Sequence, residues 1–197
     1  MTHASAPGKI ILFGEHAVVY GQPALAVPVH QVHADADVSD SDRAGIWVNA
    51  PDIRLHAAHS GLALDDALAA TISVVYEKIG IPLPEKDGVE IKVASTIPLA
   101  SGLGSGAAVS VAIIRALSAH LEHPLGDEQV NEIAYEVEKI HHGTPSGIDN
   151  TVVTYAKPIF FIKGQPIKLL NVAKPFTIII GDTGIPDNDR EGFGNIQ

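Results

Sequence analysis

Residues 98–108 read Pro-Leu-Ala-Ser-Gly-Leu-Gly-Ser-Gly-Ala-Ala, a glycine-rich turn between two stretches of different periodicity. Before it, residues 89–93 alternate between apolar and polar side chains, which predicts a strand. After it, residues 107–121 are small and apolar, which predicts a helix. Glycines let backbone N–H groups approach an anion closely, and a helix N-terminus adds unsatisfied donors and a positive dipole end. The sequence therefore indicates either a phosphate-binding loop or a tight turn with close helix packing.

The spacing of residues in this loop excludes two common nucleotide-binding motifs. No Lys-Ser or Lys-Thr pair follows the last glycine, so the loop is not a Walker A motif. The glycines also lack the G-x-G-x-x-G spacing of a dinucleotide-binding turn. Any phosphate bound here would be held by the backbone N–H groups of a loop that belongs to neither of these two motifs.

The pattern outward from this loop mixes strands and helices and predicts an α+β fold with a mixed sheet. Further strands are expected at residues 5–13, 31–39, 159–162 and 176–180, and residues 46–48 could pair with the strand at 31–39. Further helices are expected at residues 65–79, with Asp65 or Asp66 at the start and Gly80 at the end, and at residues 127–140. We expect a first domain over residues 1–170 and the beginning of an incomplete second domain over residues 171–197.

Composition excludes several classes of protein. The chain has 197 residues, a formal net charge of -10 and no cysteine. An acidic chain without clustered cations is a poor binder of nucleic acid or anionic membranes, and the lack of cysteine excludes a disulfide framework. No secretory signal is expected, and apolar runs such as residues 107–114 are far shorter than the ~20 residues of a membrane span. We expect a cytoplasmic protein whose partner is a small molecule.

A second candidate stretch lies near the N-terminus. Lys9 begins an apolar run, and Glu15 and His16 follow its end beside Gly14. Polar groups beside a glycine turn at a strand end are well placed to face a pocket. The alternative is that Lys9 is an ordinary solvated lysine.

The third candidate stretch is His-Gly-Thr-Pro-Ser-Gly-Ile-Asp-Asn at residues 142–150. An aspartate such as Asp149 in a loop of this composition is ordinarily a turn former. A carboxylate beside an attacking hydroxyl is also what phosphoryl transfer uses as a base. Glu138, on the preceding helix, could point to the same place and bind Mg²⁺. The ten histidines contain no H-E-x-x-H pattern, so we expect polar surface or pocket residues rather than a zinc site.

The three stretches, in this order, resemble the motifs of the GHMP kinases, the superfamily of galactokinase, homoserine kinase, mevalonate kinase and phosphomevalonate kinase. Residues 14–21, which read Gly-Glu-His-Ala-Val-Val-Tyr-Gly, and residues 142–150 are similar to the mevalonate kinase family in particular. The resemblance covers roughly residues 5–186. It implies an N-terminal domain like domain 2 of ribosomal protein S5. It also implies ATP-dependent transfer of the γ-phosphoryl group to the C5 hydroxyl of mevalonate, a step in isoprenoid precursor synthesis.

The resemblance also implies roles for single residues. Asp149 would be the base for the substrate hydroxyl, and Lys9 would stabilise the alkoxide or orient the hydroxyl. Mg²⁺ would be bound by Glu138 and Ser105. Mevalonate would lie near Glu15, His16, Gly147 and Thr183. The ATP phosphates would be cradled by Pro98, Ser101, Gly102, Leu103, Gly104, Ser105, Gly106 and Ala107.

Two departures from the family pattern leave alternatives open. Gly106 stands where the family commonly has a second serine that binds magnesium, and the family's third, C-terminal glycine-rich motif is absent. The alternatives are another GHMP small-molecule kinase, for phosphomevalonate or a sugar, and an inactive nucleotide-binding or self-associating fragment. A homodimer also remains open.

Overall fold

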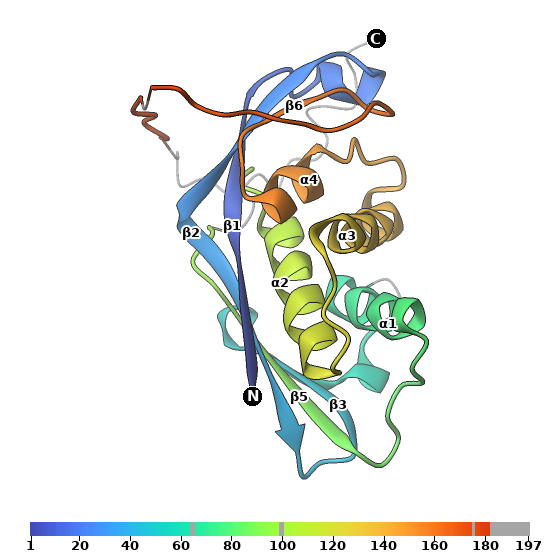
Figure 1. The fold of residues 1–197 in the computed structure, drawn as a ribbon. Coiled ribbons are helices and arrows are strands. Elements are labelled where there is room, and N and C mark those ends of the chain that lie inside the picture. Colours follow the sequence, from blue (N-terminus) through green and yellow to red (C-terminus); the bar gives the residue numbers. More distant parts are fainter. Residues whose placement is uncertain (64–65, 99–100, 175, 182–197) are drawn as a thin grey trace.

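The computed structural model describes residues 1–63, 66–98, 101–174 and 176–181. They form a two-layer α+β unit in which the helices lie on one face of a twisted sheet (Figure 1). The α-helices are α1 (Ala67–Ile79), α2 (Ser105–His120), α3 (Asp127–His142) and α4 (Ile148–Tyr155). Short 3₁₀ turns cover Ala17–Tyr20, Pro51–Ile53 and His59–Gly61. The strands are β1 (Thr2–Phe13), β2 (Ala24–Ser41), β3 (Gly45–Ala50), β4 (Leu55–Ala58), β5 (Gly88–Ser95), β6 (Ile159–Phe161) and β7 (Lys168–Leu169). The predicted α+β class with a mixed sheet is confirmed.

The sheet is built around β2, the longest strand. Its order is β4-β3-β5-β2-β6-β7, and β1 also pairs with β2. The β3–β5 pair is parallel and the other pairs are antiparallel, so the sheet is mixed. The predicted strand at residues 31–39 is therefore the second half of an 18-residue strand that also contains the apolar run after Ala24.

Helix α2 lies at the centre of the molecule, between the sheet and the other helices (Figure 1). It packs against β1 and β2 on one side and contacts α1, α3 and α4. A helix that is apolar over most of its surface is stable when most of that surface is buried. The buried residues of α2 are Ala107, Ala108, Ser110, Val111, Ala112, Ile113, Ile114, Ala116, Leu117 and Ser118. Its small side chains allow this central helix to approach the sheet closely.

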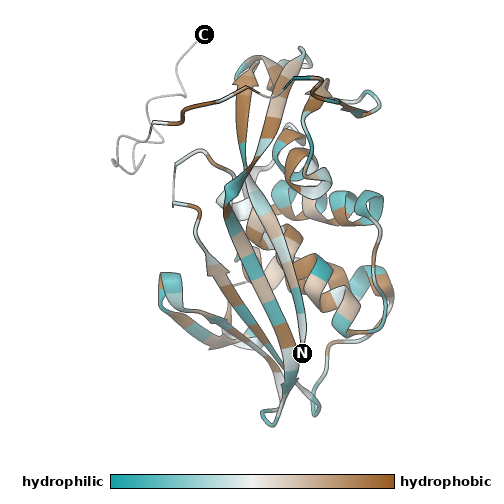
Figure 2. Ribbon diagram, turned by 60° about the vertical axis from the view of Figure 1, so that its left-hand side comes forward, coloured by the Kyte–Doolittle hydropathy of each residue, from teal (hydrophilic) through white to brown (hydrophobic). Residues whose placement is uncertain are grey.

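The opposite face of the sheet is polar. Alternate residues of β2 separate the two faces, because Ala34, Ala36 and Val38 are fully buried beneath the helices while Asp35 and Asp37 are not. Figure 2 shows the resulting bands of hydrophilic and hydrophobic residues along the strands.

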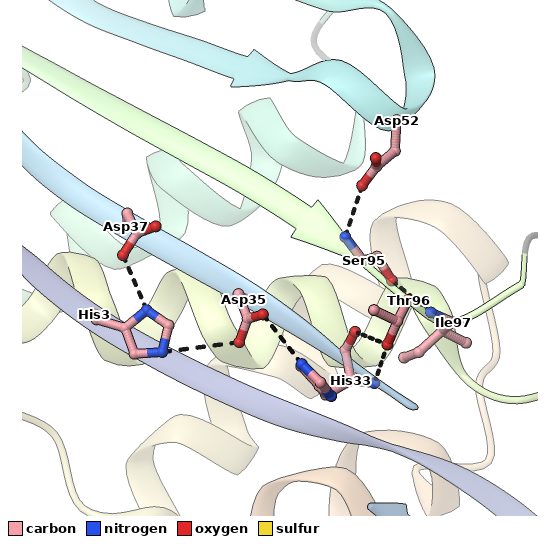
Figure 3. A network of polar contacts seen from close by, with 8 residues as sticks. All are labelled: His3, His33, Asp35, Asp37, Asp52, Ser95, Thr96 and Ile97. Carbon is pink, nitrogen blue, oxygen red and sulfur yellow. Dashed lines mark hydrogen bonds and ion pairs between the residues drawn. The ribbon is translucent and has the colours of Figure 1, made fainter. Parts of the chain in front are cut away.

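On this polar face, hydrogen bonds and ion pairs link neighbouring strands (Figure 3). His3 Nδ1 lies 2.9 Å from Asp37 Oδ1, and His33 Nε2 lies 3.3 Å from Asp35 Oδ2. His33 also exchanges hydrogen bonds with Thr96, through its backbone N–H and carbonyl. These contacts link β1 to β2, and β2 to the residue that follows β5.

Several predicted elements are confirmed with small shifts in their ends. Strands at residues 5–13, 89–93 and 159–162 correspond to β1, β5 and β6, and the helix after residue 127 corresponds to α3. The helix after the glycine loop begins at Ser105, two residues before its predicted start. In α1, the side chain of Asp66 caps the helix and Gly80 ends it with φ 73°, as expected.

Two predictions about strands are wrong, and one helix was not foreseen. Residues 46–48, within β3, pair with β4 and β5 rather than with β2, because β5 occupies the edge of β2 that β3 would need. Residues 176–180 form no strand, since no neighbouring strand pairs with them among the described residues, and Ile179 is 92% exposed. Helix α4 replaces the second half of a predicted loop. No helix in the described part of the chain is long and apolar enough to cross a membrane.

The cap of α1 gives a test of the fold. Asp66 accepts hydrogen bonds from the backbone N–H groups of Leu68 (2.9 Å) and Ala69 (3.1 Å). Asp66→Ala should lower the free energy of unfolding by about 0.5–2 kcal/mol, measured by urea denaturation. Asp66→Asn is the matched control and should keep most of the stability. Equal losses in both variants would contradict a capping role.

Candidate active site

Lys9 and Asp149 form an ion pair at the centre of the structure. Lys9 lies in the middle of β1 and is only 5% exposed, and its Nζ is 3.0 Å from Asp149 Oδ2. The Asp149 side chain is 35% exposed, so this carboxylate connects the buried lysine to solvent. A buried ammonium group is costly without a partner of opposite charge. The predicted solvated alternative for Lys9 is therefore wrong, because the side chain points into the helix layer.

The glycine loop is fastened directly to the strand that carries Lys9. The backbone N–H of Lys9 donates a hydrogen bond of 2.9 Å to the carbonyl of Leu103. Ser101 Oγ donates to the carbonyl of Pro98 (2.7 Å). Gly104 has φ 75° and forms the N-cap of α2. Leu103 and Gly104 thus lie directly against the strand that carries Lys9.

The outer side of this loop is open. A Cβ atom placed on Gly102 or Gly106 would meet no atom within 4 Å, and both residues are exposed. The first N–H groups of α2 have no partner within the helix. They lie at the positive end of a 16-residue helix dipole. This combination of open space, free backbone donors and favourable potential suits an anionic group such as phosphate.

Helix α4 positions Asp149 in its first turn. Gly147, at φ 87°, is the N-cap, and Ile148 N–H donates to Ser146 Oγ (3.3 Å). Asn150 is buried, and its Nδ2 donates to Asn131 Oδ1 (2.7 Å) on α3. These contacts hold the start of the helix so that Asp149 faces Lys9.

Sequence reasoning missed this helix and the Asn131–Asn150 bond. Residues 148–155 read Ile-Asp-Asn-Thr-Val-Val-Thr-Tyr, a short stretch rich in β-branched residues, which disfavour helix. The segment is nevertheless helical because burial outweighs this low helix propensity: Thr151, Val152 and Val153 pack into the core. The one local signal was Ser146-Gly147 before an apolar residue, which is compatible with a helix start.

The remaining predicted site residues lie on several different elements or follow them in the chain. Glu15 and His16 are exposed and follow the end of β1, beyond Phe13. Ser105 is the first residue of α2, and Glu138 lies on the last turns of α3; both are partly exposed. Thr183 lies outside the described residues.

Magnesium fits the chemistry of two of these donors. Mg²⁺ takes hard oxygen ligands, usually one or two from the protein, and completes its shell with phosphate oxygens and water. The Glu138 carboxylate and the Ser105 hydroxyl are ligands of this type. The described residues contain no group of three or more His, Asp, Glu or Cys side chains that could hold a metal alone. A metal at this site would therefore have to share its ligands with a bound phosphate.

A groove of about 720 Å³ lies beside the loop. Pro98 and Leu103 line it from the loop, and the rest of its lining is mainly apolar. Its volume is within the range of small-molecule sites. The other lining residues are Ile10, Val27, Pro28, Val29, His30, Gln31, Val32, Ala156, Pro158, Val172, Phe176, Ile178 and Ile180.

Comparison with known proteins gives consistent matches. The family described as GHMP kinases N terminal domain matches residues 66–157. A mevalonate kinase of Thermococcus sibiricus is 36% identical over 206 residues, which cover 98% of this chain and 61% of that protein. The chain thus spans about three-fifths of the length of this curated relative.

Solved structures agree with the sequence matches. The mevalonate kinase of Methanococcus jannaschii superposes with a TM-score of 0.76 at 25% identity, over 86% of this chain and 56% of that one. The mevalonate kinase of L. major, solved in complex with R-mevalonate, gives a TM-score of 0.67 at 28% identity, over 86% of this chain and 52% of that one. The matched fold is the unit that carries the Lys9–Asp149 pair and the glycine loop. The GHMP kinase N-terminal domain model thus matches the part of the chain that contains α1 to α4 and β5, and the relatives and structures compared with it are mevalonate kinases.

Proposed function

We propose that this chain is the nucleotide- and substrate-binding part of a mevalonate kinase. The observation that carries the proposal is the Lys9–Asp149 pair at 3.0 Å, fastened to a glycine loop at the N-terminus of α2. The arrangement brings a carboxylate base and a cation to the loop that would hold the ATP phosphates. The curated relatives and the L. major complex with R-mevalonate support mevalonate as the substrate.

In the proposed reaction, Asp149 accepts the proton of the substrate hydroxyl while Lys9 stabilises the developing negative charge on that oxygen. The substrate hydroxyl must approach both Nζ and Oδ2, so it would insert beside the existing ion pair. Because Asp149 is the partly exposed member, it is the group that an incoming substrate reaches first. The protein's contribution is positioning and charge neutralisation rather than covalent chemistry.

The glycine loop would hold the triphosphate of ATP. Its open glycines, Gly102 and Gly106, leave backbone N–H groups accessible, and Gly104 with Ser105 begins the helix whose dipole favours anions. The remaining loop residues, Pro98, Ser101, Leu103 and Ala107, would shape this cradle. The resident ion would be Mg²⁺ on Glu138 and Ser105, where it would neutralise charge on the phosphates. Gly106 supplies no hydroxyl, so water would take the position of the family's second serine.

Mevalonate itself would lie toward Glu15, His16, Gly147 and Thr183, beyond the end of β1 and at the start of α4. We also propose that residues 1–170 form the N-terminal domain and that residues 171–197 begin the second. The apolar side chains of Phe176 and Ile179 are exposed, which supports their assignment to a segment outside the first domain.

The direct test of this function is an assay of ADP release with ATP, Mg²⁺ and mevalonate. It should be run on this chain and on a chimaera that adds the remaining C-terminal residues of the Thermococcus sibiricus relative. We expect mevalonate to support turnover in the chimaera at least, with galactose and homoserine giving none. Turnover with galactose or homoserine instead, or none with any substrate in either protein, would contradict the proposal.

Asp149→Asn tests the proposed base. Removing the proton acceptor should lower kcat by roughly 10²–10⁴-fold while ATP binding persists, measured by steady-state kinetics and calorimetry. Asp42→Asn, a change at an exposed aspartate, is the matched control and should leave kcat unaltered. Activity of the Asp149 variant close to that of the original chain would show that another group is the base.

Lys9→Met tests the proposed cation, because methionine keeps most of the apolar stem and removes the charge. We expect kcat to fall by roughly 10²–10³-fold, as when one group that stabilises a developing oxyanion is removed. Lys92→Met is the control at an exposed lysine on β5. If kcat of the Lys9 variant falls by less than about threefold relative to that control, Lys9 has only a structural role as the partner of Asp149.

A further inference from the structure

Two glycines of the loop share a backbone conformation but differ in their surroundings. Gly102 has φ 73° and Gly104 has φ 75°, both in the left-handed region. A Cβ atom on Gly102 would point into open space. A Cβ atom on Gly104 would lie 2.6 Å from Lys9 Cγ and 3.1 Å from Lys9 Cε. The loop therefore touches the lysine side chain at one glycine and leaves the other glycine free.

Neither the loop nor the strand can easily move apart to make room at Gly104. The Lys9 N–H bonds to the Leu103 carbonyl at 2.9 Å, one residue before the contact. The strand also approaches the loop at Gly8, where a Cβ atom would lie 3.2 Å from the same Leu103 carbonyl oxygen. An added methyl group at Gly104 would thus have to be accommodated by the lysine side chain.

The Lys9 side chain cannot move aside without breaking its ion pair with Asp149. Cγ lies near the backbone end of the side chain, so moving it requires a change in the first side-chain torsions rather than a small shift of the tip. Such a change displaces Nζ from its position 3.0 Å from Asp149 Oδ2. Since Lys9 is only 5% exposed, solvent offers no ready alternative partner.

We propose that Gly104 is a positioning residue for Lys9. The absence of a side chain at this position leaves the space that Lys9 needs to adopt the rotamer that pairs with Asp149. This role is separate from the close approach of phosphate to the loop, for which Gly102 and Gly106 offer the open space. The effect of Gly104 on turnover rests on the proposed function. The steric coupling between Gly104 and Lys9 does not.

A double-mutant cycle tests the coupling without any need for activity. Gly104→Ala and Gly102→Ala impose similar left-handed strain on alanine, so the part of their difference in melting temperature that depends on Lys9 reports the contact with its side chain. We expect Gly104→Ala to lower the melting temperature by several degrees more than Gly102→Ala. In a Lys9→Ala background, where Cγ, Cδ and Cε are gone, this difference should shrink to less than half, and the remainder is the cost of alanine at the N-cap of α2. A difference of unchanged size in that background, or no difference in the original chain, would overturn the proposal.

The reactivity of the lysine gives a second, site-specific readout. Acylation of amines, followed by peptide mass spectrometry, compares Lys9 with the exposed Lys92 in the same molecule. Gly104→Ala should raise the ratio of Lys9 to Lys92 acylation at least fivefold, and Gly102→Ala should leave it within twofold. General loosening would raise the ratio in both variants, and that result, or an unchanged ratio in Gly104→Ala, would contradict a specific positioning role.

In a protein that shows kinase activity, Gly104→Ala should also lower kcat at least tenfold, because the displaced ammonium no longer faces the reacting oxygen. Unchanged kcat together with the expected acylation result would remove the catalytic part of the proposal. If no variant and not even the original sequence phosphorylates mevalonate, the proposed function fails, but the cycle and the acylation ratio still decide the role of Gly104.

Discussion

A single buried charge constrains the centre of this molecule. Lys9 is carried into the interior by β1, where its ammonium group is costly unless a carboxylate and well-placed polar groups compensate for the loss of water. Asp149 provides that carboxylate at 3.0 Å from the start of α4. The N-termini of α2 and α4 consequently meet the same side chain, and the loop before α2 must pass over the lysine stem. The Lys9–Leu103 hydrogen bond and the contact of Gly104 with the Lys9 stem hold this part of the loop against β1.

The rest of the fold supplies the rigidity that such a pair needs. The central helix α2 is packed by small residues against the sheet and the other helices, so its N-terminus has little freedom. Arg115 strengthens this arrangement, because it bonds both to Asp127 Oδ1 (2.6 Å) and to the carbonyl of Thr154 (2.7 Å). The beginning of α3 and the end of α4 are thereby tied to α2. The two helices that bear on Lys9 are thus held relative to each other.

Periodicity and glycine chemistry predicted most of the fold but less of the site. Regular alternation marked β2 and β5, and a run of β-favouring residues marked β1. The glycine loop before an apolar stretch marked the start of α2 to within two residues. Parallel pairing of β3 with β5 could not be read from local sequence, because neither strand carries information about which edge is free. Helix α4 was missed because burial outweighs the low helix propensity of Val152 and Val153. The chemical roles of the site residues remain proposals.

The most direct test of the central claim is a titration of the ¹⁵N-labelled chain with Mg·ATP, followed through its backbone amide resonances. If the loop over the Lys9–Asp149 pair is the nucleotide site, saturable shifts should concentrate at the amides of residues 102–107, with smaller ones at Lys9 and Asp149. Saturable shifts elsewhere, for example in residues 81–88 near the opposite end of the sheet, with none in the loop, would contradict the account. The absence of any saturable shift would contradict it as well.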